Sequence, residues 1–383
     1  MNSNLYFNVL PEKLAAIEER RLCTRCIMDT SDPDISFDDR GICSHCRDYD
    51  ILVLRQQRSC TTQSAFKRIV EEISSHGKGR PYDCLIGLSG GVDSSYLAYV
   101  ARQAGLRPLV VHVDAGWDSE LAVKNIEKLV RRLDLDLHTV VVDWDEMRDL
   151  QASFMRAEVP NQDIPQDHVF AAAVMSTAAK HNIRYVLNGS NTSTESIMPR
   201  AWGYNSLDLR HLRAIHRRFG TRKLRTYPTI SFFEYYVYHP RIRGIRTIRL
   251  LNFLEYEKAK AIDILQQQLG WKYYGGKHYE STFTKFFQAH YLPTKFGYDK
   301  RRAHLSSLVV SGQLSREQAL LEMQQPLYDP RQLLEDKEYI AKKLGIPFQE
   351  LDDILARPGK PHADYPSNER LFRFKDWLIK KNG

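Results

Sequence analysis

The sequence predicts an α/β fold, a doubly wound parallel sheet between a cysteine-rich N-terminal segment and a mainly helical C-terminal region. Three observations support this prediction. Short apolar runs alternate with helical patterns from about residue 80 to 190, which is typical of parallel βαβ units. A Gly-rich turn follows the first apolar run, and strand signals fade from about residue 250 onward. We therefore expect three regions, residues 1–75, 76–250 and 251–383.

The N-terminal segment contains Cys23, Cys26, Cys43 and Cys46 in the pattern C-x2-C-x16-C-x2-C. This spacing is typical of a Zn²⁺ site built from two knuckles. The stretch is turn-rich and has little apolar core, so a bound ion would supply much of its folding energy. Four thiolates complete a tetrahedron, which indicates structural zinc (Zn2+). Two disulfides are the alternative, which a cytoplasmic setting disfavours.

The remaining elements follow from apolar periodicity. Strands are expected over residues 83–88, 108–113, 137–143 and 184–189. Helices are expected near 63–75 and over 94–104, 120–133, 168–181, 257–270 and 316–323. A Pro-rich connection over 357–368 precedes a final short helix. Ligands of such sheets bind beyond the carboxyl ends of the strands, where the motifs below fall.

Composition and charge narrow the class of protein. With 43% hydrophobic and 27% charged residues, the chain is typical of folded globular proteins. It has no apolar run long enough to span a membrane, and its first residues lack the features of a signal peptide. We expect a cytoplasmic protein. The net charge of +8 favours a polyanionic ligand such as RNA, a nucleotide sugar, ATP or an acidic membrane surface.

Much of the positive charge is concentrated between residues 210 and 249. The cations there are Arg210, Arg213, Arg217, Arg218, Arg222, Lys223, Arg225, Arg241, Arg243, Arg246 and Arg249, against the single acid Glu234. A solvated basic face, a contribution to a diphosphate site and a partner-docking surface remain alternatives, because charge alone identifies no ligand.

The stretch LIGLSGGVDSSYLAYV, residues 85–100, is the clearest functional motif. Its two glycines allow successive backbone N–H groups to face an anion, and the N-terminus of the following helix adds positive potential. The serine hydroxyls can donate hydrogen bonds to phosphate oxygens, and Asp93 suits such a site as a Mg²⁺ ligand or a helix cap. The expected phosphate-binding residues are Ser89, Gly90, Gly91, Val92, Asp93, Ser94 and Ser95.

The string Ser-Gly-Gly-Val-Asp-Ser-Ser resembles the PP-loop of the ATP pyrophosphatase superfamily, which includes GMP synthetase, asparagine synthetase, NAD synthetase and tRNA thiolases. The resemblance implies a Rossmann-like PP-loop fold and cleavage of ATP between the α and β phosphates. The loop would hold the departing pyrophosphate while AMP passes to an acceptor oxygen, with Mg2+ assisting. It accounts for the missing Walker-type lysine, which serves γ-phosphate transfer.

The same resemblance assigns two further segments to ATP. VHVDAGW (111–117) corresponds to the adenine-binding strand end, and VLNGSNTSTES (186–196) to a late loop against ATP. The candidate ATP-binding residues are Val113, Asp114, Gly116, Gly189, Ser190 and Asn191, and the candidate Mg²⁺ ligands are Asp93 and Glu195. An ordinary strand exit and a simple polar turn are the alternatives.

Residues 270–320 resemble the C-terminal signature of the N-acetyl sugar amidotransferase family. Its members join a four-cysteine zinc motif, a PP-loop domain and this block, so the match extends from about Cys23 to Met323. The resemblance implies an enzyme that adenylylates the N-acetyl oxygen of a nucleotide-activated sugar. Ammonia then replaces it to give an acetamidino sugar for surface polysaccharide (O-antigen) biosynthesis.

The cations of this block suit a sugar diphosphate and AMP. The candidate substrate-binding residues are Lys285, Lys295, Lys300, Arg301 and Arg302, and the candidate catalytic residues are Asp93, Lys277, His278 and Glu280. His278 with Glu280 can move protons as ammonia attacks. Each residue taken alone is equally well a surface residue, and it is their clustering that favours a site.

The cysteines also bear on the ammonia source. Residue 2 is Asn, and neither Cys60 nor Cys84 has the setting of a glutaminase nucleophile. We therefore expect a separate glutaminase, and the family resemblance implies partners like the glutaminase and cyclase subunits of imidazole glycerol phosphate synthase. A tRNA-modifying thiolase is the main alternative. Sulfur transfer needs a persulfide cysteine or an iron–sulfur cluster within or after the catalytic domain. No cysteine follows Cys84, and Cys84 lies within the first predicted strand, so no nucleic-acid partner is expected. The intact Asp93 disfavours a non-catalytic nucleotide-binding subunit.

Overall fold

The structure, a computed structural model, describes residues 20–59, 63–275 and 279–382, and it confirms the predicted α/β class. Within these residues five parallel strands lie in the order β3-β2-β1-β4-β5. The strands are β1 (Cys84–Gly87), β2 (Pro108–Asp114), β3 (Asp136–Val141), β4 (Tyr185–Leu187) and β5 (Arg246–Ile248). The chain winds outward from β1 in both directions, so the switch point of the sheet lies between β1 and β4.

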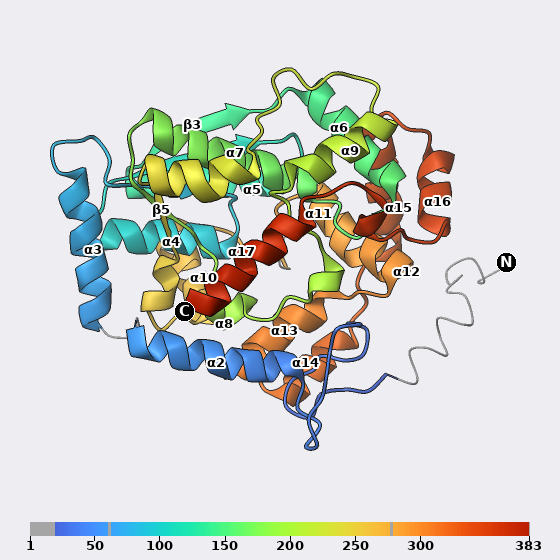
Figure 1. The fold of residues 1–383 in the computed structure, drawn as a ribbon, viewed down its shortest axis with the longest axis horizontal. Helices are drawn as coiled ribbons and strands as arrows, with labels where there is room; N and C mark the ends of the chain where they lie inside the picture. Colours follow the sequence, from blue (N-terminus) through green and yellow to red (C-terminus); the bar gives the residue numbers. More distant parts are fainter. Residues whose placement is uncertain (1–19, 60–62, 276–278, 383) are drawn as a thin grey trace.

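The helices surround this sheet and fill the C-terminal region (Figure 1). They are α2 (Ser44–Ser59), α3 (Gln63–Gly77), α4 (Val92–Gln103), α5 (Glu120–Leu133), α6 (Trp144–Ala157), α7 (Ile164–Lys180), α8 (Thr192–Glu195), α9 (Leu209–Phe219), α10 (Lys258–Leu269), α11 (Thr282–Phe286), α12 (Leu292–Phe296), α13 (Lys300–Val310), α14 (Arg316–Met323), α15 (Pro330–Leu344), α16 (Phe348–Ala356) and α17 (Glu369–Asn382). Two π-helical segments cover Glu234–Ile242 and Phe287–Tyr291. Short 3₁₀ turns cover Arg200–Trp202, Leu250–Phe253 and His362–Asp364.

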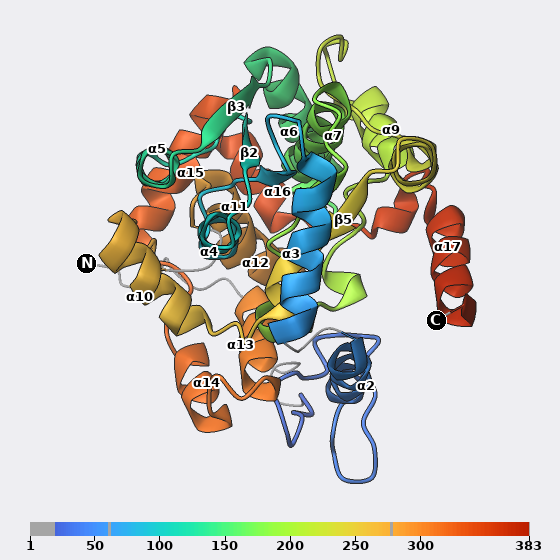
Figure 2. The ribbon, with the colours of Figure 1, turned by 90° about the vertical axis from the view of Figure 1, so that its left-hand side faces the viewer.

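Both faces of the sheet are covered, as the continuous apolar runs of its central strands require. Leu85 and Val111 belong to one hydrophobic cluster, together with residues of α6, α7 and α9. Ile86 and Val110, which point to the opposite face, belong to a second cluster with residues of α3, α4, α5 and α10. Figure 2 shows α4 and α5 on one side of the strands and α6 and α7 on the other. Successive side chains of a strand point to opposite faces of the sheet, so each face has an apolar surface on which a layer of helices packs.

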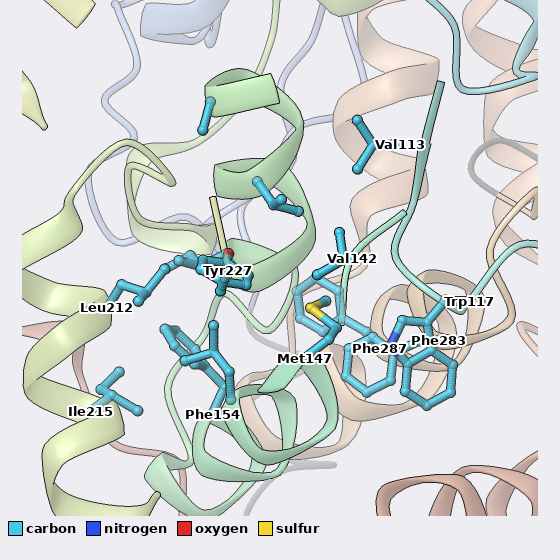
Figure 3. Packing of buried hydrophobic residues seen from close by; sticks show 14 of the residues in the cluster. Val113, Trp117, Val142, Met147, Phe154, Leu212, Ile215, Tyr227, Phe283 and Phe287 are labelled. Atoms are coloured by element: carbon cyan, nitrogen blue, oxygen red, sulfur yellow. The ribbon is translucent and has the colours of Figure 1, made fainter. Parts of the chain in front are cut away.

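The core on the α7 face also includes the C-terminal region. The rings of Trp117 and Phe283 lie 5.0 Å apart, and Figure 3 shows them beside Met147 and Phe287. All four side chains are buried. One cluster thus joins the loop after β2 to α11 and to α6, and it runs across the predicted region boundary at residue 250. The division into three regions stays a prediction.

Most predicted elements are present, with shifts of a few residues at their ends. The four predicted strands correspond to β1–β4, and α5 begins and ends at the predicted residues. The sequence analysis missed β5, because this edge strand pairs only with β4 and two of its three residues are exposed. The final helix, α17, is 14 residues long rather than short. No helix in the described ranges combines the length and apolar character needed to cross a bilayer.

The ammonium group of Lys295 is fully buried between α12 and α16. Its Nζ lies 3.0 Å from Glu158 Oε2 and donates hydrogen bonds to the carbonyls of Ile354 (2.5 Å) and Arg357 (2.6 Å). A charge can be buried at such a position only because it is paired and hydrogen-bonded. Lys295, predicted to bind substrate, therefore joins helix ends in the interior.

We expect Lys295→Met to lower the free energy of unfolding by about 3 kcal/mol, because it leaves the Glu158 carboxylate buried with one partner fewer. Lys360→Met is the matched control. Its Nζ lies 3.5 Å from the same carboxylate, but its side chain is 42% exposed, and it should cost less than about 1 kcal/mol. Urea unfolding measures both values. Equal losses would contradict the structural role assigned to Lys295.

Candidate active site

A pocket of about 480 Å³ opens at the carboxyl end of the sheet. Its lining comes from the β1–α4 loop, the end of β2, the β4–α8 loop and the first turns of α7. Further lining comes from residues 273–274 and 280–288, and from Lys258 and Lys300. Segments that are far apart in the sequence meet here because the carboxyl ends of parallel strands share one edge of the sheet.

The β1–α4 loop is held in an open turn around Gly90. Gly90 has φ +83°, a conformation that side chains disfavour. Its carbonyl accepts hydrogen bonds from Trp271 Nε1 (3.1 Å) and the Tyr274 hydroxyl (2.9 Å). Ser89 Oγ accepts from the Gly91 N–H (3.3 Å) and lies 3.2 Å from Ser94 Oγ. Helix α4 then begins at Val92. The loop is therefore preformed beside a helix N-terminus, the arrangement that binds phosphate.

The β4–α8 loop packs directly against the first turn of α4. A Cβ placed on Gly189 would lie 3.1 Å from the Ser94 nitrogen and from the Asp93 carbonyl carbon, so only glycine fits without displacement. This approach brings Asn191 Nδ2 to 3.3 Å from Asp93 Oδ1. The phosphate loop and the β4–α8 loop thus form one unit.

Asp93 also accepts a hydrogen bond from the Tyr256 hydroxyl. Burial, and then the nearby Asp93 carboxylate, raise the pKa of Tyr256, so the phenol stays protonated and donates. The N-cap of α4 is Gly91, so Asp93 is not a cap. Asp93 and Glu195 both line the pocket. Carboxylate oxygens are the ligands that Mg²⁺ prefers, and the assignment of these two residues to Mg²⁺ stays a prediction.

His112, on β2, joins the phosphate loop to the loop after β2. Its Nδ1 lies 3.1 Å from the Leu88 carbonyl oxygen, and its Nε2 lies 3.3 Å from Asp118 Oδ2. Burial disfavours the imidazolium, but the Asp118 carboxylate and the Leu88 carbonyl outweigh burial and raise the pKa of His112. Both ring nitrogens face acceptors, so the protonated ring fits this position.

Glu280 lies next to the phosphate loop. The Ser119 N–H donates to the Glu280 carbonyl (2.8 Å), and the Thr282 N–H donates to the Trp117 carbonyl (3.1 Å). This pairing brings Glu280 Oε1 to 3.0 Å from the position that a Cβ on Gly91 would occupy. A carboxylate from the C-terminal region therefore faces the loop. Lys277 and His278, the other predicted catalytic residues of this block, lie outside the described residues.

Among the predicted substrate-binding cations, all described, only Lys300 lines the pocket. Lys285 Nζ pairs with Asp336 (3.0 Å), and Arg301 with Asp299 (2.8 Å). Arg302 pairs with Asp29 at 3.2 Å, and Lys295 is buried as described above. Four of these cations thus hold other parts of the protein, which their clustering in the sequence did not reveal.

Some of the predicted ATP-binding residues line the pocket, and the others do not. The lining residues are Ser89, Gly91, Val92, Asp93, Ser94, Val113, Gly189 and Ser190. Five of the predicted residues belong to the same loops but are not part of the lining: Gly90, Ser95, Asp114, Gly116 and Asn191. Asp114 Oδ1, for example, accepts from the Gly116 N–H (2.8 Å), and the Ser95 hydroxyl donates to the Gly90 carbonyl (3.4 Å).

Several pocket residues were not predicted. Asp163, Gln166 and Asp167 lie at the N-terminus of α7 with the i, i+3, i+4 spacing of one helix face, a signal that was available in the sequence. Lys258, which lines the pocket, and Tyr256, which donates a hydrogen bond to Asp93, had no such signal, because nothing in the sequence places the start of α10 beside the β1–α4 loop.

The four predicted zinc ligands are brought together in a buried cluster. The Sγ–Sγ distances are 3.9 Å for Cys23–Cys46, 3.6 Å for Cys26–Cys43 and 3.7 Å for Cys43–Cys46. A tetrahedral Zn²⁺ with ligands at 2.3 Å requires about 3.8 Å. Backbone N–H groups also point at the sulfurs, for example Cys43 N at 3.3 Å from Cys23 Sγ. The cluster fits a structural zinc ion.

The cluster packs against the C-terminal helices (Figure 1). Arg302 Nη1 donates to the Ile27 carbonyl (2.7 Å). Arg316 donates to the carbonyls of Cys26 (3.1 Å) and Cys23 (3.0 Å). Arg302 belongs to α13, and Lys300, the first residue of α13, lines the pocket. The cysteine cluster therefore supports one wall of the pocket.

The strand order and the Ser-Gly-Gly loop at the switch point define a doubly wound α/β protein, to which the four-cysteine cluster is joined. Residues 280–379 match the family described as "LPS biosynthesis protein WbpG-like, C-terminal domain". This match confirms the recognition of the C-terminal region.

No curated protein matches the chain in a sequence comparison. Solved structures to which it is similar include an NMN synthetase from Francisella tularensis, at 17% identity and a TM-score of 0.28, covering 34% of this chain and 56% of that chain. The chain thus spans little more than half of that protein. They also include an NH3-dependent NAD synthetase from Campylobacter jejuni, at 14% identity and a TM-score of 0.29, covering 74% of this chain and 96% of that chain.

Metal analysis tests the cysteine cluster. We expect about one zinc per chain, and we expect Cys43→Ser to lose it and to lower the free energy of unfolding by several kcal/mol, because ion binding contributes to folding. Cys84→Ala changes a buried cysteine outside the cluster and should retain the metal. A zinc-free wild type, or a Cys43→Ser variant with full zinc content, would contradict the assignment.

The raised pKa of His112 predicts a pH-dependent contribution to stability. The protonated ring paired with Asp118 contributes fully below the ordinary pKa of about 6.5 and loses this contribution as pH rises through the raised value. Unfolding free energies should therefore differ more between wild type and His112→Gln at pH 6 than at pH 9. Asp118→Asn should abolish most of this difference. A difference that is equal at both pH values would refute the ion pair.

Proposed function

We propose that the chain is an ATP-dependent, AMP-forming amidotransferase of LPS O-antigen biosynthesis. Its acceptor is the N-acetyl oxygen of a nucleotide-activated sugar, and its product is an acetamidino sugar. One observation carries the proposal: the preformed Ser-Gly-Gly loop and the start of the WbpG-like region face each other across one pocket, with Glu280 beside Gly91.

The loop side of the pocket suits ATP. Ser89, Gly91 and the first turn of α4 line this side of the pocket, and the Ser89 and Ser94 hydroxyls lie 3.2 Å apart there. Such donors stabilise a departing pyrophosphate without a lysine. Asp93 and Glu195 would hold Mg²⁺, which would neutralise phosphate charge.

The opposite wall suits a sugar nucleotide. Asp163 and Gln166 from α7 hydrogen-bond to each other, and Thr284 donates to Asp163 Oδ1 (3.0 Å), so α7 and α11 form one polar surface. Carboxylates and amides of this kind bind sugar hydroxyls, whereas Lys258 and Lys300 at the pocket suit phosphate oxygens.

The chemistry requires activation of an amide oxygen. That oxygen attacks the α-phosphorus of ATP, the bond to pyrophosphate breaks, and an O-adenylyl imidate forms. Ammonia then adds to the imidate carbon, AMP leaves with the former acetyl oxygen, and an amidine remains. The nitrogen must lose a proton during this exchange, and we propose that Glu280, which lines the pocket, accepts it. The pocket contributes positioning and charge stabilisation.

The cysteines favour this chemistry over sulfur transfer. None of the described residues that line the pocket is a cysteine. Cys84 is buried inside β1, where burial raises the pKa of its thiol, and Cys60 lies outside the described residues. We propose that the enzyme is cytoplasmic, that a separate glutaminase supplies its ammonia, and that tRNA is not its acceptor.

The proposal is tested by incubating the protein with ATP, Mg²⁺, ammonium and a panel of UDP-N-acetyl sugars, with AMP and amidine measured by mass spectrometry. We expect AMP release to depend on one of the sugars. Asp93→Asn should lower the rate at least about 100-fold, because a group that acts at the reacting phosphates is lost. Asp145→Asn, on α6 outside the pocket lining, should leave it unchanged. AMP formation only in the presence of tRNA would refute the proposal.

A further inference from the structure

Helix α17 presents an apolar stripe to solvent. Leu371, Phe374, Trp377 and Leu378 are 47%, 58%, 54% and 38% exposed, and their spacing places them along one side of the helix. The rings of Phe374 and Trp377 are stacked, with centroids 5.9 Å apart. The opposite side holds the helix to the protein, because Phe372 is only 6% exposed. The outward stripe is therefore a stable feature of the surface.

A second exposed apolar group lies beside α17. Phe372 packs on Phe232 at a centroid distance of 5.2 Å, and Lys375 Nζ lies 4.5 Å from the centre of the Tyr236 ring. The segment that contains these two rings also exposes Phe233 (58%) and Ile242 (64%). The inner side of α17 thus packs on the segment 232–242, which exposes apolar side chains of its own, and Figure 2 shows α17 at the margin of the molecule.

The basic stretch of residues 210–249 borders this region, and the pocket does not use it. All the cations of the stretch are exposed, and none of them lines the pocket. Arg218, at the end of α9, lies 5.6 Å from the ring of Tyr365, just before α17. Two of the cations have acidic partners, Arg222 with Asp145 and Arg246 with Glu72. Glu234 is the single acid within residues 210–249, so the stretch has a large excess of positive charge.

The combination of apolar stripe and positive charge restricts what binds there. A second copy of the chain in an isologous contact would set the same cations against each other. RNA would satisfy the cations, but it would leave aliphatic side chains such as Leu371 and Ile242 without a partner, since nucleic acids stack on rings. An anionic membrane supplies phosphates for the cations and an acyl boundary for the apolar stripe.

We propose that α17 together with segment 232–242 and the basic stretch binds the surface of an anionic lipid bilayer. The helix would lie in the plane of the interface, with Phe374 and Trp377 at the depth of the headgroups. This surface is separate from the pocket, so the inference does not depend on the reaction assigned above. It gives the basic stretch of the sequence a function.

The test is co-sedimentation of the full chain with vesicles of phosphatidylcholine alone or of phosphatidylcholine and phosphatidylglycerol in equal parts. We expect binding to the anionic vesicles only, weakening as salt increases. A Phe374→Ser, Trp377→Ser variant and an Arg213→Gln, Arg217→Gln variant should each bind about 10-fold or more weakly. Ile51→Ser, Leu54→Ser removes exposed apolar groups from α2 instead and should bind as wild type does.

Circular dichroism and zinc content confirm that each variant is folded. Three results would overturn the proposal. The first is absence of binding to the anionic vesicles. The second is binding that neither surface variant weakens. The third is a different occupant: tRNA that competes with the vesicles at equal charge, or a dimer, detected by sedimentation equilibrium, that the Phe374→Ser, Trp377→Ser variant dissociates. Loss of AMP release with retained vesicle binding would instead concern the proposed reaction alone.

Discussion

The site depends on the close approach of two backbones, the β4–α8 loop at Gly189 and the first turn of α4. With glycine at this position the loops touch, and Asn191, Tyr256 and Asp93 meet in one hydrogen-bonded group. The approach is possible because β1 and β4 are neighbours at the switch point of the sheet. A Cβ at Gly189 would require the two backbones to move apart by a few tenths of an ångström.

The cysteine cluster contributes to the same pocket from a distance. Ile27 N–H donates to Ser306 Oγ (3.2 Å) on α13, and Ile197 N–H donates to Ser307 Oγ (3.0 Å) of the same helix. Helix α13 is therefore held between the cysteine cluster and the segment after α8. Lys300, in the first turn of α13, is thereby positioned at the pocket. A metal ion bound by the four cysteines would thus stabilise the position of Lys300 at the pocket, through α13. The cysteine cluster and the proposed active site are thus connected through packing.

The sequence predicted what local patterns determine. Apolar runs located β1–β4, cysteine spacing located the cluster, and the Ser-Gly-Gly motif located the turn between β1 and α4. The sequence could not separate cations whose surroundings depend on tertiary contacts. Lys295 and Arg302 have the same chemical character as Lys300, but they form ion pairs with Glu158 and Asp29. No local pattern distinguishes a cation that is buried in an ion pair from one that lines a pocket. The contact of Tyr256 with Asp93 likewise exists only once α10 packs beside α4.

The central claim is that the loop directs AMP to the acetamido oxygen of the acceptor. It is tested most directly with a nucleotide sugar labelled with oxygen-18 in its N-acetyl carbonyl, incubated with the protein, ATP and ammonium. If the oxygen attacks the α-phosphorus, the label appears in the phosphate of AMP, and the amidine product contains none. Label in inorganic phosphate with formation of ADP, or AMP without label beside an amidine, would contradict the account.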